Sequence, residues 1–130
     1  MDSLEQEIRK AKRTNCIIFG IYAAVLVFVI LAGWSYHARR SFSTEKWLRN
    51  PEERTRIVGD LLRDHKLVGM EEAEVVELLG SDDRDRGYFV EEDRFVYYLG
   101  PERGFISIDS EWLILEFADG VVWDYDLTTD

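Results

Sequence analysis

The sequence lacks the residues that build covalent or metal-bound frameworks. Its single cysteine, Cys16, excludes a disulfide within the chain. The two histidines, His37 and His65, lie far apart, and no His/Cys cluster has the spacing of a metal site. A glycine-rich phosphate loop is also missing. We therefore expect no metal, no cofactor and no catalytic activity.

A basic surface is the second thing that the sequence lacks. Its 130 residues carry a formal net charge of −10. Residues 37–67 contain eight Lys or Arg and five Asp or Glu, whereas residues 68–130 contain four and eighteen. Nucleic-acid binding requires a basic face. We therefore expect no nucleic-acid partner.

One long uncharged run, residues 17–36, stands out from this charged background. A helix of that length spans about 30 Å, the thickness of the hydrocarbon core of a bilayer. The sequence therefore predicts a transmembrane helix at 16–36, after an N-terminal segment at 1–15, with the lipid bilayer as a partner. The side chains expected in the membrane are Ile17, Phe19, Ile21, Val25, Leu26, Phe28, Ile30, Leu31, Trp34 and Tyr36.

A cleavable signal peptide is the competing interpretation of this run. Its apolar region is usually about 7–15 residues long and ends in a small-x-small site. This run is longer, and a bulky residue stands three positions before Ala32 and before Gly33. Cys16 precedes the run, whereas the cysteine of a lipoprotein signal follows it. We therefore expect an uncleaved, single-pass signal anchor in the cell membrane.

Basic residues flank both ends of the run, so the positive-inside count does not decide its orientation. We expect the amino terminus inside and the C-terminal domain outside, as is common for signal anchors with short N-terminal segments. Gly20 and Ala24 form a small-xxx-small pair, which lets two helices approach closely. A weak homodimer through this pair is a further possibility.

The remaining sequence predicts a linker at 37–49 and an α+β domain at 50–130. Asn50 is a candidate helix cap before Pro51, and the apolar spacing that follows is helical. A second helix begins after Gly69 and stops at Gly80. Period-two patterns then predict strands at 88–90 and 94–100 and a hairpin at 111–127. We expect two helices packed on one face of an antiparallel sheet of about three strands.

The hairpin turns at Asp119-Gly120, a favoured two-residue loop. Pairing of 117 with 122 and of 116 with 123 puts Leu113, Leu115, Phe117 and Val122 on the face that the helices cover. The other face then carries Trp112, Ile114, Trp123 and Tyr125, which we predict to bind a partner. Alternatively, the linker, the curl of the sheet or a second copy covers these side chains. A bulge at Gly120 would change the pairing.

Three segments, "LVGMEEAEVVELLG", "YYLG" and "LILEFADGVV", resemble small bacterial envelope domains of the SmpA/OmlA type. That family includes the small lipoprotein of the outer-membrane β-barrel assembly machine, and its fold is similar to one repeat of β-lactamase inhibitor protein. The resemblance covers roughly residues 50–127. The matching positions are Gly69, Met70, Val75, Leu79, Gly80, Leu113, Phe117, Asp119 and Gly120.

This sequence departs from the lipoprotein members in two places. No lipid-attachment cysteine follows the apolar run, and Ser81-Asp82 replaces their proline-bearing turn. The resemblance implies a domain that binds or scaffolds another envelope protein, here tethered by a helix instead of a lipid. A small-ligand-binding or inhibitory module on the sheet face is the alternative.

Overall fold

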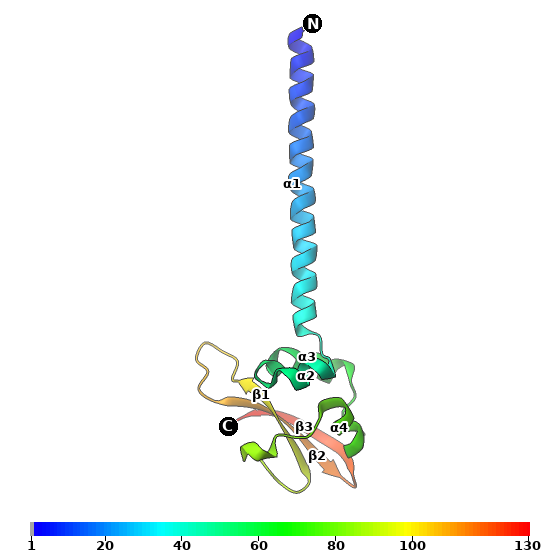
Figure 1. Ribbon diagram of the computed structural model, residues 1–130, viewed down its shortest axis with the longest axis vertical. Coiled ribbons are helices and arrows are strands. Elements are labelled where there is room, and N and C mark those ends of the chain that lie inside the picture. Colours follow the sequence, from blue (N-terminus) through cyan, green and yellow to red (C-terminus); the bar gives the residue numbers. More distant parts are fainter. Residues whose placement is uncertain (1) are drawn as a thin grey trace. The chain divides into compact units, whose positions relative to one another are not determined.

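The computed structural model describes residues 2–130, so Met1 of the predicted N-terminal segment lies outside the described residues. The chain has an α+β fold and divides into two compact units, which meet between Ala38 and Arg39. Helix α1 (Asp2–Arg40) makes up the first unit almost entirely and buries none of its residues (Figure 1). It extends the predicted span of 16–36 in both directions.

Helix α1 is long and apolar enough to cross a membrane, by length and composition alone. A signal sequence near the N-terminus fits the same description. All ten side chains predicted to face lipid are exposed, so none of them serves a protein core. The structure therefore supports the coarse expectation of a membrane-associated helix.

The second unit contains short helices and one antiparallel sheet, as predicted. Its helices are α2 (Thr44–Arg49), η1 (Pro51–Glu53), α3 (Arg54–Asp64), α4 (Glu72–Leu79) and η2 (Arg84–Arg86). Its strands are β1 (Arg94–Pro101), β2 (Ser110–Ala118) and β3 (Val121–Thr129), in the spatial order β1-β2-β3. Both β1 and β3 are therefore edge strands of this sheet.

The two predicted helices exist, with one change at the start of the first. Residues 51–53 form a 3₁₀ turn, and the Asn50 side chain donates to Glu53 instead of capping. In α4, the Glu71 and Glu74 side chains form a capping box. Gly80 ends this helix with a φ of +76°, a conformation that glycine adopts without strain.

The predicted linker at 37–49 is shorter than expected, because α2 occupies its second half. The Ser43 hydroxyl accepts from the Lys46 N–H at 3.2 Å and caps this helix. Trp47 is completely buried, and the Phe42 ring packs edge-on against it at 5.9 Å. The domain therefore begins before residue 50.

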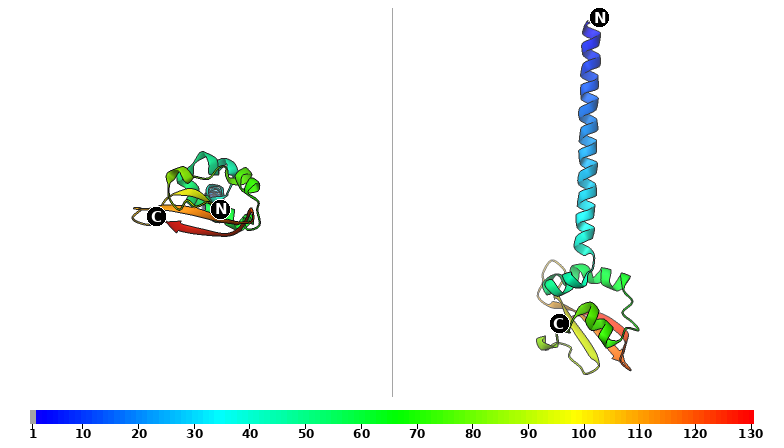
Figure 2. Two further views of the ribbon diagram at one scale, coloured as in Figure 1. Left: turned by 90° about the horizontal axis from the view of Figure 1, so that it is seen from below. Right: turned by 45° about the vertical axis from the view of Figure 1, so that its right-hand side comes forward.

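The main core lies between the helices and one face of the sheet. Figure 2 shows α2, α3 and α4 on the same side of the strands. The predicted inner face of the hairpin is confirmed. The core side chains are Trp47, Ile57, Val58, Leu61, Leu67, Val75, Leu79, Tyr97, Leu99, Leu113, Leu115, Phe117 and Val122.

Residues 88–90, predicted to form a strand, belong instead to a loop. Phe89 has a φ of +56°, outside the extended region that a strand requires. The rings of Tyr88 and Phe89 lie 5.6 and 6.3 Å from the Trp112 ring. This loop therefore covers part of the second sheet face, where Val96, Tyr98 and Trp112 form a smaller core.

The hairpin has the predicted turn but not the predicted pairing throughout. Phe117 pairs with Val122 as expected, whereas Glu116 pairs with Asp124. Trp123 is therefore an extra residue, and the bulge lies three residues after Gly120 rather than at it. Because side chains alternate along a strand, one extra residue moves every later side chain to the other face.

Candidate functional site

The four residues predicted to bind a partner do not form one surface. Trp112 and Ile114 are buried, so neither side chain forms an exposed contact surface, although Trp112 lines the hollow described below. Trp123 is exposed at the bulge, and Tyr125 is exposed opposite Leu115, on the helix side of the sheet. The expected exposure of Trp112 and Ile114 is not met, and the rings of the loop at 88–90 pack on Trp112. A binding role for the four residues stays a prediction.

The second sheet face is partly covered, with an open hollow beside the covered part. The Trp112 indole donates to the Asp130 carboxylate at 3.3 Å, and the Arg86 guanidinium lies 3.8 Å from the centre of the Tyr98 ring. The hollow measures about 520 Å³. Its lining residues are Arg86, Tyr88, Tyr98, Ile108, Asp109, Ser110, Trp112 and Asp130.

Side chains and backbone from earlier in the chain occupy the outer edge of β1. The Val96 N–H donates to the Asp82 carboxylate at 3.1 Å, and the Val96 carbonyl accepts from the Asp83 N–H at 2.6 Å. The Tyr98 N–H donates to the Asp83 carboxylate at 2.9 Å, and the Tyr98 carbonyl accepts from Arg54 at 2.9 Å. A further strand cannot pair here without displacing these groups.

Arg54 is the centre of this closed edge and is only 4% exposed. Its guanidinium also donates to the Trp47 carbonyl and to Asp83, both at 2.8 Å, and it lies over the Trp47 ring at 4.7 Å. Burial lowers the pKa of Arg54, and the Asp83 carboxylate opposes this shift only in part. The buried charge therefore has one carboxylate and two carbonyls as partners, as a buried cation requires.

A buried tyrosine connects the same region to helix α4. Burial raises the pKa of Tyr97, so its phenol stays protonated across the physiological range. The Tyr97 hydroxyl donates to the Gly80 carbonyl at 2.9 Å. This bond joins the end of α4 to β1 on the side of the sheet where α3 also packs.

The outer edge of β3 is paired only at its start. The Val122 carbonyl accepts from the Gly69 N–H at 2.7 Å, and the Val122 N–H donates to the Met70 carbonyl at 2.9 Å. Within residues 2–130, no strand lies beside residues 124–129 on the side away from β2. Along this edge Trp123, Tyr125 and Leu127, hereafter the β3 stripe, are 55%, 38% and 39% exposed. Tyr125 and Leu127 lie on the helix side of the sheet, whereas Trp123 lies at the bulge near Arg94 and Glu116.

A second exposed apolar surface lies in the loop between β1 and β2, which projects from the sheet in Figure 1. Phe105, Ile106 and Ile108 are all exposed at its tip. Sequence reasoning marked this segment as a loop but overlooked these side chains. Three large apolar residues in a short segment that begins with Gly104 were the available signal.

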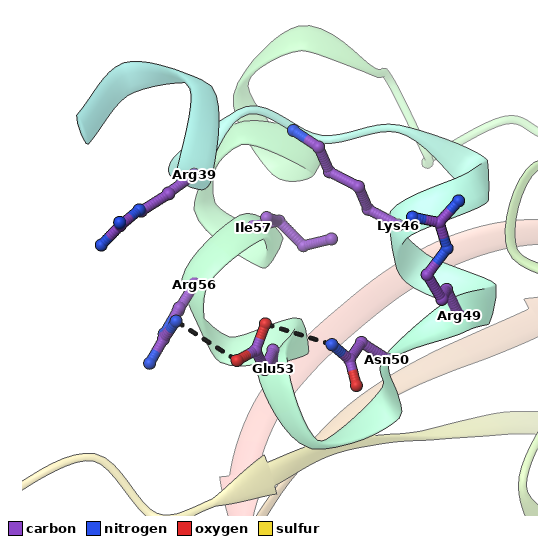
Figure 3. Close-up of a pocket in the computed structure, with 7 residues that line it drawn as sticks. All are labelled: Arg39, Lys46, Arg49, Asn50, Glu53, Arg56 and Ile57. Carbon is purple, nitrogen blue, oxygen red and sulfur yellow. Dashed lines mark hydrogen bonds and ion pairs between the residues drawn. The ribbon is translucent and has the colours of Figure 1, made fainter. Parts of the chain in front are cut away.

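A basic pocket of about 220 Å³ lies beside α2 and the start of α3 (Figure 3). The Glu53 carboxylate projects into it and accepts from Asn50 and from Arg56, each at 3.3 Å. Lys46 donates to the Ser41 carbonyl at 3.0 Å, and Arg49 pairs with Glu45. Because these donors are already engaged, the pocket offers an anion less than its composition suggests. Its other lining residues are Arg39 and Ile57.

No protein-family model matches this sequence, and no curated protein matches it significantly. The resemblance to SmpA/OmlA-type domains therefore stays a prediction, because a helix–helix–sheet order alone does not identify a family. Among residues 2–130, no three His, Cys, Asp or Glu side chains lie together as metal ligands would. The geometry instead offers surfaces for contact with another molecule.

Proposed function

We propose that this chain is a single-pass membrane protein of the cell envelope whose C-terminal domain binds another protein. The amino terminus lies inside, α1 spans the membrane, and the domain lies outside. Phe42 already packs against the domain core. Only residues 37–41 therefore separate the domain from the predicted span, and because 37–40 continue helix α1 they span about 10 Å. The domain stays close to the bilayer surface.

The β3 stripe is the observation that supports protein binding most strongly. Tyr125 and Leu127 lie two residues apart on one side of this edge, and small soluble domains rarely leave large apolar side chains exposed together without using them. Aromatic residues are enriched in protein interfaces, and Trp123 and Tyr125 both lie at an edge beside which residues 2–130 place no further strand. The surplus of acidic residues after 68 disfavours an anionic lipid surface and favours a basic partner.

Site-specific photo-crosslinking of the full chain in native membranes tests this proposal. A crosslinking residue replaces Tyr125 on β3, Phe105 on the loop, or Glu77 as an exposed control on α4. We expect a discrete adduct with one other protein, identified by mass spectrometry, from at least one of the first two positions and none from Glu77. Adducts with lipid alone, or no adduct from either position, would contradict a protein-binding role.

The membrane placement has a separate test. We expect the chain to stay in the pellet after carbonate extraction, and the domain to be digested when protease is added to spheroplasts. A chain released by carbonate is not anchored by α1. A domain protected until the membrane is opened lies inside, which reverses the orientation proposed above.

A second candidate function rests on the hollow on the second sheet face. Three rings, of Tyr88, Tyr98 and Trp112, line it together with Arg86 and Asp130. This composition suits a small planar ligand, which favours the alternative of a ligand-binding or inhibitory module. Tyr88 is exposed, so Tyr88→Ala keeps the fold and removes one wall. Ligand-induced stabilisation that is lost in this variant would support the second candidate, while unchanged crosslinking would separate it from the first.

A further inference from the structure

The pairing of the sheet determines which backbone groups of β3 face the open edge. Residues of an antiparallel pair alternate between bonded and non-bonded positions. Val96 directs its N–H and carbonyl away from β2, so its partner Ile114 directs its own towards β3. Ile114 pairs with Asp126. The neighbours of Asp126, Tyr125 and Leu127, therefore direct their N–H and carbonyl groups away from β2.

One hydrogen bond of β3 agrees with this alternation. The Tyr125 N–H donates to the Asp124 carboxylate at 2.9 Å, which places this N–H away from β2. Asp124 is exposed, so its carboxylate bonds equally well to water when another acceptor replaces it. The open edge therefore offers backbone groups at Tyr125 and Leu127, of which one N–H is held by a displaceable side chain.

Apolar and acidic side chains lie on opposite sides of the sheet along this edge. Tyr125 and Leu127 pair with Leu115 and Leu113, so they lie on the helix side of the sheet. Asp124 and Asp126 pair with Glu116 and Ile114, on the opposite side. The edge is therefore apolar on one side and acidic on the other. We refer to Asp124 and Asp126 as the acidic pair.

We propose that β3 accepts an extended segment of a partner protein as a fourth strand, and that this segment alternates apolar and basic side chains. The inference rests on the proposed function and specifies its binding mode. Alternate side chains of an added strand point to opposite faces. Apolar ones lie beside Tyr125 and Leu127, and Lys or Arg side chains lie beside the acidic pair.

The acidic pair also disfavours a second copy of this chain as the occupant. Pairing β3 with another β3 would bring the aspartates of both copies close together, and like charges on neighbouring strands are destabilising. Charged residues on an edge strand likewise prevent edge-to-edge aggregation. A basic segment neutralises the charges of Asp124 and Asp126. The acidic pair therefore disfavours a second copy of this chain and favours a basic partner segment.

Binding of a short synthetic peptide of alternating Lys and Val to the full chain in lipid nanodiscs tests the inference. We expect the amide resonances of Tyr125 and Leu127 to shift and to gain protection from hydrogen exchange. A Glu–Val peptide, and a Lys–Val peptide methylated on alternate backbone nitrogens, should each bind at least about tenfold more weakly. No binding of the Lys–Val peptide up to about 1 mM, or equal binding of all three, would overturn the inference.

Two variants of Leu127 distinguish the contribution of its backbone N–H to binding from that of its side chain. Leu127→Pro removes an N–H that β2 does not use, so an edge strand tolerates it. We expect it to weaken Lys–Val binding at least about tenfold, whereas the matched control Leu127→Ala keeps the N–H and loses less. Circular dichroism and thermal melting establish that both variants are folded. Equal losses in the two folded variants would contradict strand addition.

A charge reversal tests the partner chemistry separately. Asp126 is exposed, so Asp126→Lys keeps the fold and places a basic side chain on the acidic side of the edge. We expect this variant to prefer the Glu–Val peptide over the Lys–Val peptide. An unchanged preference would show that the acidic pair does not select the occupant.

The crosslinking experiment separates this inference from the proposed function. Capture of a protein through Phe105 but not through Tyr125 would overturn strand addition at β3 and leave a protein-binding domain. Capture through Tyr125 that persists in Leu127→Pro would also overturn it, because an added strand needs that backbone edge. Capture through neither position would overturn both.

Discussion

The β1 edge and the β3 edge of the same sheet differ in what their backbone groups contact. At β1, the outward groups of Val96 and Tyr98 are bonded to Asp82, Asp83 and the buried Arg54. At β3, within residues 2–130, the outward groups of Tyr125 and Leu127 bond only to the neighbouring Asp124 carboxylate, through the Tyr125 N–H. The β1 edge is therefore closed by hydrogen bonds to a buried ion pair, whereas the β3 edge remains open to a strand of a partner.

The short helices explain part of this difference. Helix α3 and the 3₁₀ turn η1 pack against β1, and Gly100 lies against the η1 backbone. From β3, only Val122 belongs to the main core. Beyond Val122, Tyr125 and Leu127 lie on the helix side of the sheet but stay 38% and 39% exposed.

The largest effect on stability is expected from removing Arg54, which bonds to the outer edge of β1. Arg54→Ala leaves the Tyr98 and Trp47 carbonyls without this donor, and the Asp83 carboxylate keeps the Tyr98 N–H but loses its arginine. The free energy of unfolding should fall by about 3–5 kcal/mol, as when one partner of a buried ion pair is removed. Urea unfolding of the full chain in detergent, followed by near-UV circular dichroism, measures it.

Arg56→Ala is the matched control, because Arg56 is an exposed arginine of the same helix, paired with Glu53. Its loss should cost less than about 1 kcal/mol. Equal costs for the two arginines would mean that the closed edge does not stabilise the domain.

A smaller effect is expected from the carboxylate that faces Arg54. Asp83→Ala removes the acceptor of the Tyr98 N–H and should cost about 2–3 kcal/mol, because the Asp83 side chain is still 24% exposed. The Arg54→Ala/Asp83→Ala double variant should show a coupling of about 1–3 kcal/mol in urea unfolding. Additive costs would contradict a connected network.

Two glycine substitutions compare a crowded position on β1 with an open turn before β3. A Cβ on Gly100 would lie 2.3 Å from the Glu52 carbonyl oxygen, at a φ of +126°. Gly120 has a φ of +80° but open space around it. We expect Gly100→Ala to cost about 2 kcal/mol or more and Gly120→Ala about 1 kcal/mol, by thermal or urea unfolding. The opposite order would contradict the close approach of η1 to β1.

The smallest effect is expected on the open edge itself. Tyr125→Ala removes a half-exposed side chain that supports no core, so it should cost less than about 1 kcal/mol in unfolding. The same variant should weaken capture of the partner in native membranes. A loss of more than about 2 kcal/mol would instead make Tyr125 a structural residue.

The hairpin shows which features a local sequence pattern predicts and which it does not. The Asp119-Gly120 turn and the inner face up to Val122 followed from sequence, because turn chemistry and alternation act over a few residues. The bulge at Trp123 did not follow. Trp123, Tyr125 and Leu127 alternate with aspartates whether or not a residue is extra, so the pattern is identical in both registers.

The closed edge was not predictable for a different reason. Asp82 and Asp83 lie in a stretch rich in both charges, which suits a solvated loop, and Arg84 does pair with Asp82. Their backbone partners Val96 and Tyr98 lie 14 and 15 residues further along the chain. No local pattern marks an interaction over that separation. The burial of Trp47 was missed likewise, since its helix has only six residues.

Hydrogen exchange of individual amides compares the two edges most directly. In the full chain in nanodiscs without a partner, NMR should find the Val96 and Tyr98 amides strongly protected. The Leu127 amide should exchange nearly as fast as an unstructured peptide, with Tyr125 only slightly slower. Protection of Leu127 equal to that of Val96 would mean that the β3 edge is already closed, and would contradict the proposed strand addition.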